Sequence, residues 1–377
     1  MKSTPPSFVL FAALAGVLVS APSANAYSPI IRSYHSVRAA GMGDVRYTTG
    51  VFDENFFGNP ARLARNPNDL FQLPTISVEA GSSTLNTVSS LTKNGGGDGL
   101  SKFADAVGEP ISASVQMVFP AYYNKEFLAS FWSFAVGMEV RAQTIAEVGE
   151  SALIDPTTIV NAGPVVSIAR KLLPNNALTV GVNAHGEMRA SSGSMFSVLD
   201  FLKGTDVDQV VKGGSAVGYD FDFGVSFRPH WTLGGFSYEV DGAVNNILGG
   251  KYDNIKKNLI SGWDKQAPIG ASRSYNVGVS ASRTDLPMFT NLTLAVEMTD
   301  IGNNPDGSLF RNLHIGAEGV ARIMTFRAGI NQGYWTAGFG LDLRFFELNV
   351  ASYGEELGLN AGVQEDRRYA AEFGFKI

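Results

Sequence analysis

Hydrophobic and polar residues alternate with a period of two along most of the chain after about residue 74. Residues 219–228 place Tyr, Phe, Phe, Val and Phe on one face and Asp, Asp, Gly, Ser and Arg on the other. The end of the chain, 369–377, repeats this pattern. Because successive side chains of a strand point to opposite faces, the pattern predicts β-strands with one apolar and one polar face.

The chain contains fourteen segments of this kind, and bacterial single-chain barrels have an even number of strands. Each segment is about as long as a tilted membrane strand. The predicted strands are residues 74–81, 112–123, 126–141, 158–170, 177–191, 216–228, 231–245, 273–284, 290–300, 311–320, 322–331, 335–344, 346–354 and 367–377.

Long and short links alternate between these segments. Links such as 82–111, 192–215 and 246–272 are long, whereas we expect tight turns at Asn124–Lys125, Pro229–His230 and Phe345. A membrane barrel sorts its links in this way, with long loops outside and short turns in the periplasm. The fold expected is therefore all-β, an antiparallel transmembrane β-barrel of about fourteen strands. A soluble β-sandwich, which also alternates, is the competing interpretation.

Residues 1–26 have the pattern of a secretory signal peptide. A basic Lys2 precedes the apolar stretch 8–19, and Ala24-Asn25-Ala26 forms an A-x-A cleavage site before Tyr27. The apolar stretch is too short for a transmembrane helix, which needs about 20 residues. We expect cleavage near Ala26 and a mature protein in the outer membrane of a Gram-negative cell.

The composition narrows the partners that the protein can have. The chain has no cysteine, so it has neither disulfides nor the lipidation site of a lipoprotein. A formal net charge of -6 argues against a nucleic-acid partner, because phosphate binding needs a basic face. The partners expected are membrane lipid, a hydrophobic small molecule, and, alternatively, a secretion or envelope protein.

Residues 27–73 carry apolar side chains without a strand period, which predicts an N-terminal hatch or plug arm ahead of a barrel at 74–377. The arm contains Ala40-Gly41-Met42-Gly43 and, further on, Asn59-Pro60-Ala61. On its own, Asn-Pro is a common turn starter. Asn59, Pro60 and Ala61 are our candidate hatch motif.

These motifs resemble those of the FadL/TodX-like outer-membrane barrels and their PorV-like and TraF-like relatives. Those families open with a small-Met-Gly segment and an Asn-Pro-Ala-(Gly)-Leu motif, similar to Asn59-Pro60-Ala61 followed by Leu63, with Arg62 where glycine is usual. The stretches 312–318 and 327–330 are similar to the closing strands of the PorV-like and TraF-like members. The resemblance implies passive transport of small hydrophobic compounds such as long-chain fatty acids. The PorV-like alternative implies a docking or assembly partner of a secretion or envelope complex.

Charged residues of both signs fall on the predicted inward faces. Charge facing lipid is costly, so we expect a wet or salt-bridged lumen, or contacts that hold the plug to the wall. The candidate lumen residues are His185, Glu187, Asp220, Asp222, Arg228, His314, Glu318, Arg327, Asp342 and Arg344.

No motif indicates an enzyme. The four histidines, His35, His185, His230 and His314, lack a His or Cys partner at metal-binding spacing, and the sequence contains no G-x-S-x-G. We expect no catalytic residue, no metal and no cofactor. A general porin remains a third alternative, and the predicted plug argues against it.

Overall fold

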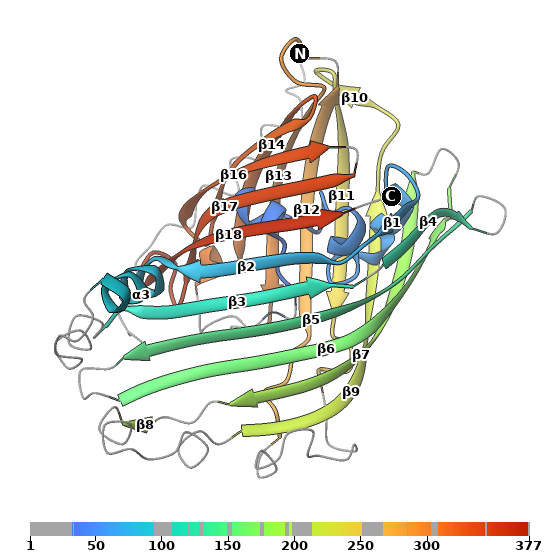
Figure 1. Cartoon of the computed structure of the whole chain (residues 1–377). Coiled ribbons are helices and arrows are strands. Elements are labelled where there is room, and N and C mark those ends of the chain that lie inside the picture. Colours follow the sequence, from blue (N-terminus) through green and yellow to red (C-terminus); the bar gives the residue numbers. More distant parts are fainter. Residues whose placement is uncertain are drawn as a thin grey trace.

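The computed structural model describes residues 32, 34–93, 108–119, 121–127, 131–148, 153–173, 177–192, 196–197, 213–250, 267–284, 286–302, 308–343 and 345–375. Fourteen long strands form a ring (Figure 1). They are β2 (Thr75–Gly81), β3 (Pro110–Val118), β5 (Trp132–Val148), β6 (Leu153–Lys171), β7 (Leu178–Ser192), β9 (Gly213–Phe227), β11 (Phe236–Asn245), β12 (Ser274–Thr284), β13 (Asn291–Ile301), β14 (Leu313–Ala321), β15 (Met324–Asn331), β16 (Tyr334–Leu343), β17 (Phe346–Glu356) and β18 (Glu365–Phe375).

The ring is closed and wholly antiparallel. Each of these strands pairs with the next one, and β18 returns to pair with β2 from Arg368↔Gly81 to Phe373↔Ile76. Closure gives every ring strand two neighbours, so the backbone polar groups of the wall have partners without water. The predicted fourteen-stranded barrel is confirmed.

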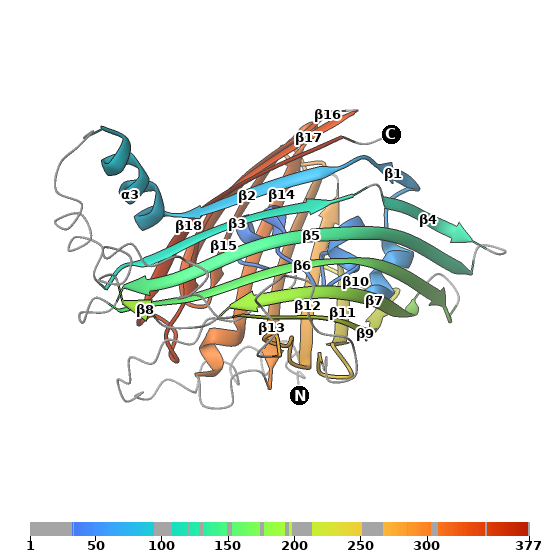
Figure 2. The same ribbon diagram turned by 60° about the horizontal axis from the view of Figure 1, so that its bottom comes forward.

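Four short strands supplement the ring. β1 (Leu70–Gln72) pairs with β4 (Ala121–Phe127), which also pairs with β5, while β8 (Phe196–Ser197) and β10 (Thr232–Leu233) extend local hairpins. A helix, α3 (Ser82–Lys93), follows β2 in the first long link. It lies beside β2, β3 and β18 at the long-loop end of the barrel (Figure 2).

Each predicted strand overlaps one ring strand, but two predicted turns are wrong. Asn124 and Lys125 lie inside β4, because β4 continues past the ring and finds partners in β1 and β5. The turn predicted at Pro229–His230 lies instead at Gly234–Gly235, where both residues have the positive φ that glycine adopts without strain. The tight turn at Phe345 is confirmed.

Long and short links alternate around the ring as predicted, with three departures. At the short-turn end, residues 119–131 with β4 form a long link between β3 and β5, and the other two departures lie at the long-loop end. The link between β5 and β6 is short, because both strands run on as one hairpin from Trp132↔Arg170 to Val148↔Ile154. The link between β15 and β16 is a two-residue turn at Gln332–Gly333, with both φ values positive. That backbone matches the primed turns that join twisted antiparallel strands.

The wall is apolar outside and polar inside, the reverse of a soluble protein. In β9, Tyr219 is 62% exposed on the outer face, whereas its inward neighbour Asp220 is 4% exposed. Strands of this kind suit a ring surrounded by hydrocarbon, where the apolar face meets lipid. A soluble sandwich would bury its apolar faces instead, so that alternative is excluded.

The N-terminal segment lies inside the ring (Figures 1 and 2). It contains α2 (Val37–Gly41) and two 3-10 helices, η1 (Phe52–Asn55) and η2 (Pro60–Arg65). α2 contacts β15 to β18, while η2 contacts β4, β5, β6, β7 and β9 on the other side. A further 3-10 helix, η4 (Leu309–Asn312), precedes β14. We call residues 34–66 the plug.

Among the described residues, no helix has the length and apolar character needed to cross a bilayer.

Candidate functional site

The interface between plug and wall is the candidate functional site, and its first part is the glycine segment of the plug. A Cβ on Gly41 would lie 2.8 Å from the Cα of Gly338 in β16, and one on Gly43 would lie 2.2 Å from the carbonyl oxygen of Ile315 in β14. Gly43 also has a φ of +73°. Both positions exclude a side chain, so the Ala-Gly-Met-Gly segment brings the plug backbone directly against the wall.

The Asn59-Pro60-Ala61 motif anchors the other side of the plug. Asn59 caps η2, since its Oδ1 accepts from the backbone N–H of Ala61 at 3.1 Å. Its Nδ2 donates to the carbonyl oxygen of Val225 and to Asp241 Oδ1, both at 3.2 Å. The same side chain therefore starts a plug helix and ties it to β9 and β11.

Gly224 leaves the space that Asn59 occupies. A Cβ there would lie 2.0 Å from Asn59 Oδ1 and 2.9 Å from Pro60 Cδ. We expect Gly224→Ala to weaken plug docking by about 1–3 kcal/mol, as overpacking usually does. Limited trypsin digestion, scored as cleavage at Arg62 and Arg65, measures the loss.

The matched control for this substitution is Gly242→Ala, on neighbouring β11. A Cβ at Gly242 would meet one atom within 4 Å, the carbonyl oxygen of Asn276 at 3.8 Å. Equal cleavage of the two variants would contradict the role assigned to Gly224.

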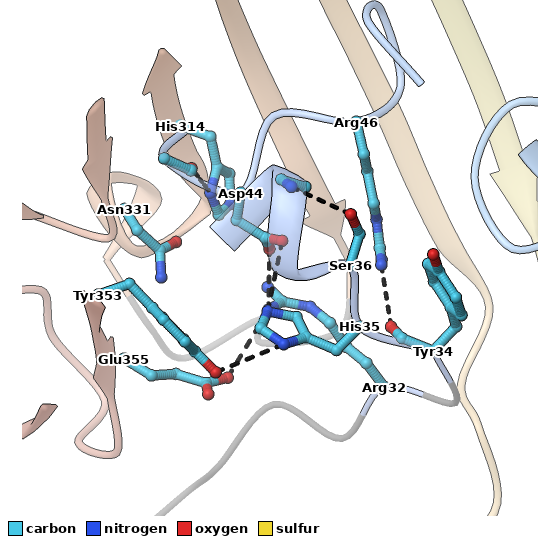
Figure 3. Close-up of polar contacts among 12 residues, drawn as sticks. Arg32, Tyr34, His35, Ser36, Asp44, Arg46, His314, Asn331, Tyr353 and Glu355 are labelled. Carbon is cyan, nitrogen blue, oxygen red and sulfur yellow. Dashed lines mark hydrogen bonds and ion pairs between the residues drawn. The ribbon is translucent and has the colours of Figure 1, made fainter. Parts of the chain in front are cut away.

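A buried network of charges joins the N-terminal segment to β2, β13, β17 and β18. Figure 3 shows the part of it that contains Arg32, His35, Asp44 and Glu355 of β17. Arg32 lies 2.9 Å from Asp44 within the N-terminal segment and 3.1 Å from Asp300 in β13. His35 contacts Glu79 of β2 through Nδ1 at 3.1 Å. These groups are all buried, and a buried charge without a partner is costly, so each partner requires the other.

Glu297 of β13 holds the plug by a different contact, with backbone donors. Its carboxylate accepts from the N–H of Arg46 at 3.0 Å, the N–H of Thr48 at 2.6 Å and the Thr48 hydroxyl at 2.7 Å. Hydrogen bonds to a charged acceptor are stronger than neutral ones. Glu297 therefore clamps the turn that follows α2.

At the short-turn end, acidic residues gather around the plug. Arg38 bridges Glu54 at 2.9 Å and Glu318 of β14 at 2.7 Å. The Tyr34 hydroxyl donates to Asp53 at 2.9 Å. Burial, and next the charge of Glu54, raise the pKa of Asp53 to about 7, although the hydrogen bond from Tyr34 opposes the rise.

This raised pKa predicts a pH dependence of plug docking. The docked carboxyl holds its proton up to about pH 7, whereas its ordinary pKa is 3.8. Because the docked state binds more protons between these values, docking is firmest at acidic pH and weakens as the pH rises through this window. Amide hydrogen exchange of the plug, corrected for the intrinsic rate, measures the trend. Asp53→Asn is expected to flatten it, and an unchanged slope would contradict the assignment.

The structure describes nine of the ten candidate lumen residues, and they lie in several different surroundings. His314 and Glu318 contact the plug, His314 through Gly43 at 3.0 Å. Asp220 and Asp222 accept from backbone N–H groups of the 246–250 loop, and Asp222 also pairs with His185 at 3.5 Å. Glu187 pairs with Arg189, and Arg327 pairs with Glu318. Arg228 pairs with Glu239 at the exposed rim, and Asp342 is exposed near the short turns. Arg344 lies outside the described residues.

Several residues of the interface escaped the sequence interpretation. Glu79 and Arg368 occupy inward positions of strands, so the alternation already contained their signal. Arg32 and Asp44 lie in the aperiodic arm, where nothing marks a charge as buried. In the part of the chain that the structure describes, no group of three or more His, Asp or Glu side chains forms a candidate metal site.

The largest buried apolar cluster of the described residues that joins plug and wall lies beside an interruption of the β6–β7 ladder. Phe56 and Leu63 of the plug pack with Val165 of β6 in one cluster. Next to Val165, the β6–β7 ladder pairs Ala162 with Met188 and then Val165 with His185, with no pair between them. Pro164 lacks the N–H that a ladder needs, which accounts for part of this break.

A small cavity lies at this break. Its volume is about 10 Å³, and it is lined by Phe57, Glu139, Asn161, Gly163, Pro164 and neighbours. A second cavity of about 40 Å³ lies towards the long-loop end, lined in part by Arg32, Arg46 and Asp300. Phe57 and His185 line both cavities and so separate one from the other.

The chain matches no protein-family model and no curated protein sequence. Among solved structures it is similar to the toluene transporter TbuX of Ralstonia pickettii, with 11% identity, a TM-score of 0.47, and coverage of 93% of this chain and 98% of that one. It is also similar to a mutant of the monoaromatic hydrocarbon channel TodX, with 11% identity, a TM-score of 0.47, and coverage of 91% and 97%.

A FadL homologue of Pseudomonas aeruginosa is a further similar structure, with 10% identity, a TM-score of 0.38, and coverage of 94% of this chain and 98% of that one. The assignment of a closed fourteen-stranded barrel containing an N-terminal plug rests on the strand pairing and on the plug contacts described above.

Proposed function

We propose that the protein is an outer-membrane channel for the passive transport of small hydrophobic compounds. Its apolar exterior and polar, plug-filled interior suit a barrel that spans lipid. The N-terminal segment contacts opposite sides of the wall, which argues against a general porin with an open bore. Passive transport needs no cofactor, and the sequence contains no catalytic motif.

The observation that carries this proposal is the apolar contact of the plug beside the break in the β6–β7 ladder. Much of the rest of the interface is charged or hydrogen-bonded, so a hydrophobic molecule would find its best surroundings at this place. The missing ladder pairs make the wall easier to open here than at a continuous ladder. A compound that entered from the loop side would pass Phe57 and leave between β6 and β7.

Binding of a labelled long-chain fatty acid to the detergent-purified mature protein tests the proposal. Saturable binding is expected for the wild type, and it should be lost in a variant that lacks residues 27–70. Phe57→Ala should also reduce binding. Phe71→Ala should not, because the Phe71 side chain in β1 is exposed. Heat-dependent gel mobility verifies that each variant is a folded barrel.

Absence of binding by the folded wild type would contradict transport of this class of compound. It would favour the alternative, a docking or assembly role in a secretion or envelope complex. The resemblance to PorV-like members supports that alternative.

A further inference from the structure

Two acceptor atoms in the cavity at the wall break have no hydrogen-bond partner. They are Oε1 of Glu139 and Oδ1 of Asn161, and the two side chains are 4% and 5% exposed. A buried polar atom without a partner costs roughly 1–3 kcal/mol, so native proteins rarely leave two such atoms in one place. Here the unused atoms are both acceptors.

The strand pairing explains why these two acceptors lie together. Glu139 of β5 is directly opposite Gly163 of β6, and Asn161 is the next inward residue of β6. Gly163 has no side chain, and the ladder to β7 is interrupted at this level. The neighbouring polar residues of the cavity have partners of their own, since His185 pairs with Asp222 and Glu187 pairs with Arg189.

The size and the apolar side of the cavity limit what can enter it. About 10 Å³ accommodates one water-sized group. Phe57 covers one side, and its ring centroid lies 6.3 Å from that of His185. The cavity therefore suits a single small donor group attached to an apolar body.

We propose that Glu139 and Asn161 form a seat for the hydroxyl group of a hydrophobic alcohol or phenol at the wall break. The hydroxyl donates its hydrogen to Oε1 of Glu139, with Asn161 lining the same cavity, and the apolar part of the molecule lies along Phe57. This inference rests on the proposed transport function and adds a substrate class to it. Compounds that lack a donor, such as ethers and hydrocarbons, leave both acceptors unpaired and bind more weakly.

The test compares p-cresol, 4-methylanisole and toluene as ligands of the full-length mature protein, with dissociation constants measured by calorimetry. The wild type is expected to bind p-cresol about tenfold more tightly than 4-methylanisole, because only p-cresol has a donor for the buried acceptor. Glu139→Leu should reduce the ratio to within about twofold, because it removes that acceptor. This variant loses an unpaired buried atom, so the barrel should still fold.

The matched control is Gln143→Leu, which lies on the same inward face of β5 but outside the cavity. It should retain the preference for p-cresol. Equal binding of p-cresol, 4-methylanisole and toluene by the wild type would overturn the hydroxyl seat while leaving hydrophobic transport intact. An unchanged ratio in Glu139→Leu would also overturn it. Failure of the wild type to bind any hydrophobic ligand would instead contradict the proposed function.

Discussion

Replacing Arg368 with leucine is expected to lower the free energy of unfolding of the barrel by about 3–5 kcal/mol. The Arg368 side chain is 1% exposed and lies 2.6 Å from Asp366 and 3.1 Å from Glu79, with Glu355 as a third ion-pair partner. Without the guanidinium, three buried carboxyl groups would lack the cation that they share, which destabilises the folded barrel. Urea unfolding in lipid vesicles, followed by heat-dependent gel mobility, measures the effect.

The neighbouring residue provides a matched control. Arg367 points to the outer face of β18, where it stacks on Trp335 with its guanidinium carbon 4.0 Å from the ring centroid and pairs with Glu365. Surface pairs contribute roughly 0–1 kcal/mol, so Arg367→Leu should have little effect. Similar losses in the two variants would show that the charge network does not hold the wall together at β18.

Replacing Glu297 with alanine is expected to release the plug without unfolding the barrel. The change removes three hydrogen bonds between one wall carboxylate and the 46–48 turn of the plug. Each bond to a charged acceptor contributes about 1.5–3 kcal/mol, so docking should weaken by at least about 3 kcal/mol. Conductance in a planar bilayer should rise from a low wild-type level, because the plug otherwise fills the bore.

Two further variants make this result specific. Glu297→Gln keeps one acceptor oxygen and should show an intermediate conductance. Glu365→Ala removes a carboxylate at the outer end of β18 that pairs with Arg367, and it should conduct like the wild type. If Glu297→Ala and Glu365→Ala conducted alike, the clamp would be contradicted.

The sequence predicted the wall well because the two faces of a membrane strand have different surroundings, so apolar and polar residues alternate along it. In 219–227 every outward residue is apolar and every inward one is polar or small. The structure exposes Tyr219, Phe221, Phe223 and Phe227 and buries the four inward residues between them. The errors lie near the ends of strands. β4 occupies the position of a predicted turn, and β5 and β6 run on beyond the predicted strand ends at 141 and 158.

The plug shows the opposite behaviour, since local sequence says little about an element whose partners come from the whole chain. On its own, Asn59-Pro60-Ala61 indicates an ordinary turn, and only the structure shows that Asn59 caps η2 and donates to β9 and β11. The glycines of the 40–43 segment are needed because the wall backbone approaches within contact distance.

The sequence by itself determined the number of strands, their faces and the presence of an aperiodic N-terminal arm, because these depend on periodicity along the chain. Only the tertiary structure decided which inward charges meet. Arg32 contacts Asp300, which is 268 residues away in the sequence, and Arg368 contacts Glu79, which is 289 residues away. Closure of the ring brings these residues together. A local sequence pattern does not indicate which strands, far apart in sequence, become neighbours in the fold. The break beside Pro164 and its two unpaired acceptors likewise result from how three strands and the plug meet.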